Sequence, residues 1–89
     1  MIRPVTFEPL AQRQIRALAP PDRAALSEVL LDLAGAADPM TVVDPYLPGG
    51  IGPLPFHGVV LTDSAEAVVT LYLDHVRVVA VRPRHCPLP

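Results

Sequence analysis

The side chains best suited to phosphate chemistry gather near the C-terminus. Arginine binds phosphate oxygens, and histidine can donate or accept a proton near neutral pH. Four such residues make the last thirteen positions the only clearly cationic stretch of the sequence: Arg77, Arg82, Arg84 and His85. The stretch is interpreted either as a local binding patch or as a solvated tail.

The charge of the whole chain argues against a general nucleic-acid-binding protein. The sequence has seven basic and nine acidic residues, and its formal net charge is -2. Broad affinity for RNA or DNA usually needs a basic surface that releases counterions from the phosphate groups. What the composition leaves open is a local cationic site.

Two other groups of residues could suggest a hydrolase or a metal site. The first comprises His57, Asp63, Ser64 and His75, but no Gly-x-Ser-x-Gly motif surrounds the serine, and Asp63-Ser64 is typical of a turn. The second is His85-Cys86, but a structural zinc site needs four ligands and the chain has one cysteine. We predict no catalytic triad, no metal and no cofactor.

Length and composition predict one small folded domain in the cytoplasm. The chain has 89 residues, of which 51% are hydrophobic and 18% charged, so it has enough apolar surface to form a core. No segment approaches the roughly 20 apolar residues of a membrane span, and a lone cysteine agrees with a reducing compartment. We predict a single domain over 1–85, followed by a tail over 86–89.

The elements that must position the cationic residues follow from periodicity and proline. A strand is predicted at 5–7, a helix from Pro9, a second helix from Asp22 to about Gly35, and strands at 56–61, 66–73 and 76–82. The fold class is therefore α+β with the order β-α-α-β-β-β. The short connection between the helices predicts a helical hairpin packed on one face of a small antiparallel sheet.

The segment 38–55 is predicted to be a long loop. It contains five prolines and three glycines in eighteen residues, including Pro48-Gly49-Gly50. A helix or a central strand does not tolerate such a sequence.

The alternation of residues in the last two strands predicts a surface for another protein. Val68 and Tyr72 in one strand, and Arg77, Val79 and Val81 in the other, fall on a face that is not cleanly polar. Two helices cover only one face of a sheet, so these residues are expected to be partly exposed. Exposed apolar surface of this kind marks an interface with a partner protein or with a second copy of the chain.

The order of the predicted elements and several short stretches resemble a known family. These stretches are Val5-Thr6-Phe7-Glu8-Pro9, the run 13–18 (RQIRAL), Asp22-Arg23, and the run 78–84 (VVAVRPR). Together they cover nearly the whole chain and are similar to the RelE/ParE superfamily of toxins from type II toxin-antitoxin systems. The resemblance implies an antitoxin-like partner.

The resemblance also implies where an active site would lie. RelE-like members cut mRNA on the ribosome with basic residues of the sheet, because negative charge builds up on the phosphate in the transition state. The family's Gly-x-Tyr-Arg-Val-x-Tyr stretch corresponds here to 64–72, where Glu66 or Ala67 replaces the arginine. The terminal arginine is matched by Arg82 or Arg84, and His85 could serve as the acid or base.

Three functions follow as hypotheses. The first is a RelE/ParE-like protein that acts through protein contacts, with a cellular target such as the gyrase poisoned by ParE-like members. The second is a ribosome-dependent mRNA endoribonuclease that uses Arg82, Arg84 and His85. The third is a non-toxic structural or assembly module that dimerises through the spare face of its sheet.

Overall fold

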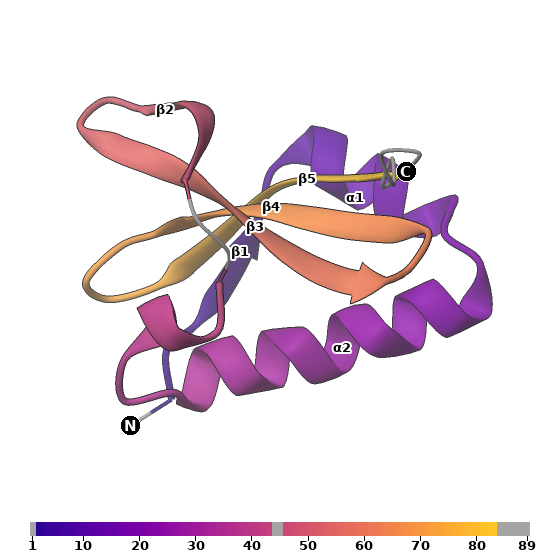
Figure 1. Ribbon diagram of the computed structural model, residues 1–89, viewed down its shortest axis with the longest axis horizontal. Coiled ribbons are helices and arrows are strands. Elements are labelled where there is room, and N and C mark those ends of the chain that lie inside the picture. The colour runs from indigo at the N-terminus through magenta and orange to yellow at the C-terminus, as the bar shows by residue number, and fades with distance from the viewer. Residues whose placement is uncertain (1, 44–45, 84–89) are drawn as a thin grey trace, which may run out of the picture.

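The computed structural model describes residues 2–43 and 46–83, and it contains two α-helices beside a five-stranded sheet (Figure 1). In chain order the elements are β1 (Val5–Phe7), α1 (Pro9–Arg16), α2 (Pro20–Gly35), the 3-10 turn η1 (Pro39–Thr41), β2 (Tyr46–Ile51), β3 (Leu54–Thr62), β4 (Ala65–Leu71) and β5 (Val76–Pro83). The α+β class and the predicted order of helices and later strands are confirmed. In the described part of the chain, no helix has the length and apolar character needed to span a membrane.

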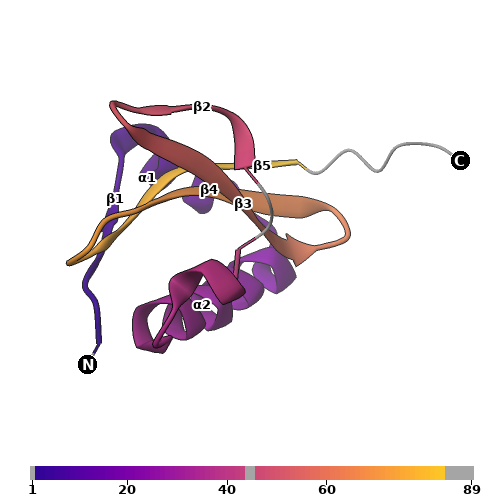
Figure 2. The same cartoon turned by 60° about the vertical axis from the view of Figure 1, so that its left-hand side comes forward.

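The sheet has the strand order β1-β5-β4-β3-β2. Strand β1 pairs in parallel with β5, whereas the other neighbouring strands are antiparallel. The prediction of a purely antiparallel sheet is therefore wrong at one edge, because the first strand joins the last one from the same direction. Figure 2 shows the strong twist of this sheet, with α2 running across one side of it.

Both helices begin where proline permits. Proline occupies the first turn of each, where its missing N–H costs no intrahelical hydrogen bond. Asp22 lies in the first turn of α2, where its charge is favourable, and its Oδ1 accepts a 2.6 Å hydrogen bond from the Thr62 hydroxyl at the end of β3. This bond fixes the start of α2 to the turn between β3 and β4.

One hydrophobic core joins both helices to one face of the sheet. It is formed by small and branched side chains that are at most 3% exposed: Ala11, Leu26, Leu33, Val59, Ala67, Val69, Val76, Val78 and Val81. Because α1 and α2 both contribute to this cluster, the predicted packing of the helical pair on one face of the sheet is confirmed.

The prediction of an irregular loop over 38–55 is wrong in its second half. Strand β2 forms an antiparallel hairpin with β3, and the pairing register shifts between Leu47 and Gly50. Gly52 has a φ of 57° in the turn, and a Cβ on Gly50 would lie 2.3 Å from the carbonyl oxygen of Leu54. These two glycines are therefore requirements of a tight hairpin, and an edge strand tolerates proline where a central strand would not.

Candidate functional site

The face of the sheet opposite the helices carries the arginines that the sequence predicts as functional. Since Ala67, Val69 and Val78 point into the core, the residues between them point the other way. We call this second surface the open face. On it, three pairs of residues lie opposite each other across β4 and β5: Glu66 and Arg82, Val68 and Ala80, and Thr70 and Arg77.

A bulge in β5 determines these pairs. The register shifts between Val68 and Val69, where Val79 is the extra residue on β5. A regular ladder continued from the pair of Leu71 and Val76 would place Val81 opposite Glu66. The extra residue brings Arg82 to that position.

The bulge also changes which residues of the predicted partner surface are accessible. Val81 lies opposite Ala67 on the core face and is 3% exposed, so its predicted exposure is wrong. Val68 is 5% exposed and Thr70, on the same face of β4, is 0% exposed, so the middle of this face is covered and the predicted exposure of Val68 is wrong as well. Tyr72, Arg77 and Val79 are half-buried and remain the accessible part of the prediction.

At one end of the open face, Arg82 forms an ion pair. Its Nε donates to Oε1 of Glu66 at 3.0 Å, and the side chains of Arg82 and Glu66 are 48% and 19% exposed. The carboxylate is thus the more buried partner. It accepts the hydrogen bond of Arg82 at the surface of the strand, while about half of the Arg82 side chain remains exposed.

The other end of the open face carries a stacked group of side chains. The guanidinium group of Arg77 lies 5.5 Å from the ring centre of Tyr72, which stacks on His75 at 4.2 Å. Arg77 also donates to Oε1 of Glu8 at 3.0 Å, and Nδ1 of His75 lies 2.7 Å from Oδ1 of Asp74. The hydrogen bond from His75 lowers the pKa of the Asp74 carboxyl below its usual value.

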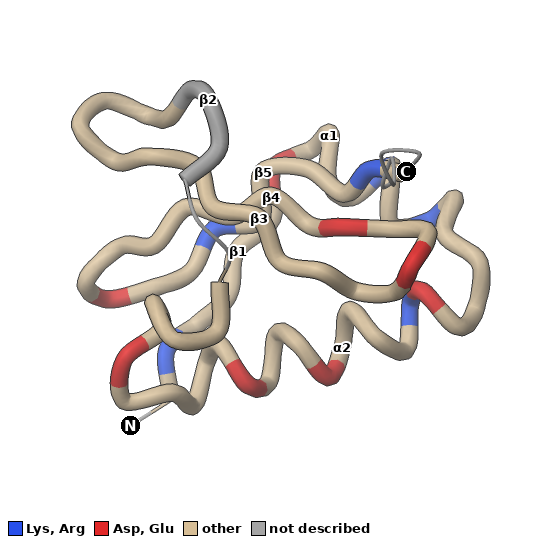
Figure 3. The backbone as a smooth tube through the Cα atoms, viewed as in Figure 1, with Lys and Arg blue, Asp and Glu red and all other residues tan. Residues whose placement is uncertain are grey.

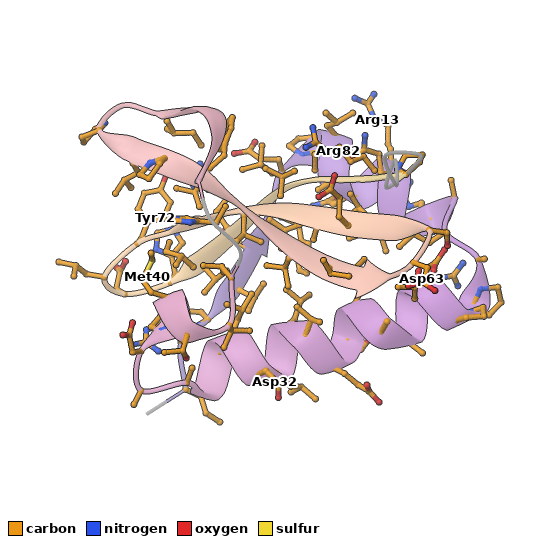
Figure 4. The ribbon with its side chains drawn as sticks, in the orientation of Figure 1. Arg13, Asp32, Met40, Asp63, Tyr72 and Arg82 are labelled. Carbon is orange, nitrogen blue, oxygen red and sulfur yellow. The ribbon has the colours of Figure 1, made fainter. Side chains whose placement is uncertain are left out.

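The two groups lie at opposite ends of the sheet. Figure 4 shows Tyr72 and Arg82 well separated, and Figure 3 shows charged residues distributed over the molecule without a basic patch on the described strands. Both arginines carried by the described strands, Arg77 and Arg82, have a carboxylate partner. The predicted site residues Arg84 and His85 and the tail over 86–89 lie outside the described residues.

Comparison with solved structures identifies the architecture. The chain resembles the RelBE2 toxin-antitoxin complex of Mycobacterium tuberculosis, with a TM-score of 0.72 and 21% identity over 94% of this chain and 100% of the other. It resembles the archaeal RelE-RelB complex of Pyrococcus horikoshii OT3, with a TM-score of 0.73 and 17% identity over 94% and 97% of the two chains. The YoeB dimer of Staphylococcus aureus gives a TM-score of 0.70 and 12% identity over 96% and 100%.

The chain has the RelE-like toxin fold. No protein-family model and no curated protein matches the sequence. At these identities the likeness establishes the fold, and the fold that the resemblance implies is confirmed. Function depends on the site that a fold carries, and two members of one fold can differ there completely.

The open face of this RelE-like fold differs from the one that the family resemblance implies. The resemblance implies an arginine on β4 at the position of Glu66 or Ala67. Ala67 is buried in the core, and Glu66 binds the arginine that β5 supplies. The sequence shows the substitution itself but not the ion pair, since only the bulge places Arg82 opposite Glu66. The ion pair could be found from the sequence only if the pairing of β4 with β5 were predicted with the extra residue in β5 included.

The remaining candidate residues have structural roles in the described part of the chain. The Ser64 hydroxyl lies 3.1 Å from that of Thr62 and 3.5 Å from Oδ1 of Asp22, so it belongs to the contact between the β3–β4 turn and α2. His57 is buried, 3% exposed, on the core side of β3. Within residues 2–43 and 46–83, no three side chains of His, Cys, Asp or Glu form a group that could hold a metal ion.

Proposed function

We propose that this chain is a RelE/ParE-like protein of toxin-antitoxin type that is bound by an antitoxin-like protein and acts through protein contacts. The observation that carries the proposal is the ion pair between Arg82 and Glu66 on the open face. The proposed location is the cytoplasm.

The ion pair opposes nuclease chemistry for an electrostatic reason. Cleavage of RNA next to a 2'-hydroxyl builds negative charge on the phosphate, and catalysis depends on cations preorganised around that charge. Here the Arg82 cation is compensated by Glu66, and the second strand arginine, Arg77, is compensated by Glu8. A phosphate brought to either end of this surface would meet a carboxylate beside the guanidinium group, and its attraction would be largely cancelled.

Two observations support a protein partner. The similar structures from Mycobacterium tuberculosis and Pyrococcus horikoshii are complexes of a toxin with its antitoxin. The accessible part of the predicted partner surface, Tyr72, Arg77 and Val79, combines an aromatic ring, an arginine and an aliphatic side chain. Tyrosine and arginine are enriched at the centres of protein interfaces.

Induced expression in a bacterial host tests this function. We expect growth arrest without cleavage of transcripts, and the Arg82→Ala variant should arrest growth as the wild type does. Transcript cleavage is measured by mapping new 5' ends in total RNA after induction. Co-purification of the tagged chain with the product of its neighbouring gene tests for the antitoxin-like partner.

The outcomes separate the three hypotheses. Cleaved transcripts that disappear in the Arg82→Ala, His85→Ala double variant would replace the proposal with the endoribonuclease. No arrest, with the chain present and folded, would favour the structural or assembly module. A Glu66→Gln variant is the matched control, since it removes the carboxylate charge and leaves Arg82 in place. If the wild type is inactive on RNA because Arg82 is compensated, this variant should be the first to gain affinity for RNA.

A further inference from the structure

An exposed leucine lies at the end of the molecule where the N-terminus and the β4–β5 turn lie (Figures 1 and 2). Leu73 in that turn is fully exposed, at 102%. Together with Arg3 and Asp74 it borders two neighbouring hollows. We call these three residues the ridge.

The hollows on the two sides of the ridge are mainly apolar. The smaller, of about 520 Å³, is lined by Ile2, Pro4 and the end of α2 at 35–37. The larger, of about 910 Å³, lies between η1, the β2–β3 turn and the end of β4, with Met40, Leu54 and Leu71 among its walls. Figure 4 places the Met40 label close to that of Tyr72, and both residues line this hollow.

Several of the apolar side chains here are open to solvent. Besides Leu73, Ile2 is 79% exposed and Met40 is 46% exposed. Scattered apolar residues are normal on a protein surface, but apolar side chains grouped around concave surface are typical of an interaction site. This end of the molecule is separate from the Glu66 and Arg82 pair, which lies at the far end of β4 and β5.

We propose that the ridge and its two hollows form a symmetric interface between two copies of this chain. A two-fold interface requires a surface that is complementary to itself, because each residue contacts the same surface on the partner. The ridge provides such a self-complementary surface, because Leu73 projects fully and a concave apolar surface lies directly beside it on the same chain. In the dimer, the Leu73 side chain of each copy enters the larger hollow of the other.

The charges on the ridge favour the same arrangement. Arg3 is a half-buried cation whose guanidinium group donates to the carbonyl oxygens of Ala36 and Ala37, and Asp74 is an anion whose side chain is 85% exposed and pairs with His75. A two-fold axis reverses one ridge against the other, so that Arg3 of one copy faces Asp74 of its partner. A strongly charged unlike partner would be selected by charge of one sign, whereas this surface carries one charge of each sign.

Sedimentation of purified protein tests the proposal. We expect the wild-type chain to be mainly dimeric at about 100 μM, and Leu73→Asp to weaken self-association by about 100-fold or more, as for a central interface residue. Met40→Asp in the wall of the larger hollow should weaken it as well. Leu31→Asp is the matched control, because Leu31 is 73% exposed on α2 and belongs to neither hollow.

Folding is monitored separately for each variant. Leu73 and Leu31 are both exposed, so neither substitution removes core contacts, and circular dichroism should be unchanged. A wild-type chain that remains monomeric at this concentration would overturn the proposal. Equal effects of Leu31→Asp and Leu73→Asp on self-association would also overturn it. A monomeric wild type in which Leu73→Asp abolishes binding of an unlike partner would do the same.

Discussion

The hydrogen bond between Gln14 and β5 gives the most direct test of how the free edge of this strand is satisfied. Strand β1 pairs with β5 only over Val76 to Val78, so beyond this point no strand of the described residues lies beside that edge of β5. Helix α1 follows β1 directly, and Oε1 of Gln14 accepts a 2.7 Å hydrogen bond from the backbone N–H of Val81. A helix side chain therefore supplies the acceptor that a longer β1 would have provided.

The expected cost of Gln14→Ala follows from this geometry. The bond is partly buried, so solvent replaces the lost acceptor only in part. An unsatisfied buried donor costs about 1–3 kcal/mol, and we expect about 1–2 kcal/mol here because of the partial exposure. For a domain of this size each kcal/mol lowers the melting temperature by about 4–8 °C, so the expected decrease is about 4–16 °C.

Thermal and urea denaturation followed by circular dichroism measure this effect. Gln12→Ala is the matched control, since Gln12 lies on the exposed side of the same helix and gains the same helix propensity. Gln14→Glu should retain most of the stability, because a carboxylate also accepts the Val81 N–H. A free energy of unfolding for Gln14→Ala equal to that of Gln12→Ala would refute the reasoning.

Three further measurements test other parts of the structure. Leu33→Ala removes a fully buried side chain and should lower the free energy of unfolding by about 2–5 kcal/mol in urea denaturation, whereas Leu31→Ala on the exposed side should cost less than about 0.5 kcal/mol. Gly52→Ala places a side chain at a φ of 57° and should cost about 1–2 kcal/mol in the same assay. The NMR-monitored pKa of Asp74 should lie below about 3.9 and return towards it in His75→Ala. Because this pKa is lowered in the folded state, the stability that the pair contributes is present above the unfolded pKa and is lost as the pH falls through the folded one. An Asp74 pKa unaffected by His75→Ala would exclude the hydrogen bond as the cause.

The sequence predicts the helices and the last three strands to within a few residues, because proline fixes the starts of the helices and the apolar spacing of α2 and β4 is regular. The sequence does not predict strand β2, because its proline and two glycines are also typical of a loop. A contact formed in the folded chain distinguishes this strand from a loop. Gly50 lies against the backbone of Leu54, and this contact exists only once β2 has paired with β3. A local pattern cannot show that contact.

The candidate site was predictable in part. The residue types on the open face follow from alternation along β4, and the absence of an arginine at Glu66 or Ala67 is visible in the sequence. The ion pair and the burial of Val81 are not, since both depend on the single extra residue at Val79. A shift of one position moves a side chain to the other face, so the error at Val81 has the same origin as the unexpected partner of Arg82.

The parallel pairing of β1 with β5 has a consequence for how the protein is made. Val5 emerges from the ribosome early, and its partner Val76 is among the last residues of the described chain to be synthesised. Contacts between such distant positions form late, because the whole intervening chain must first be closed into a loop. The nascent chain therefore remains without its completed sheet until β5 has been synthesised, and a surface that depends on that sheet appears only after that point.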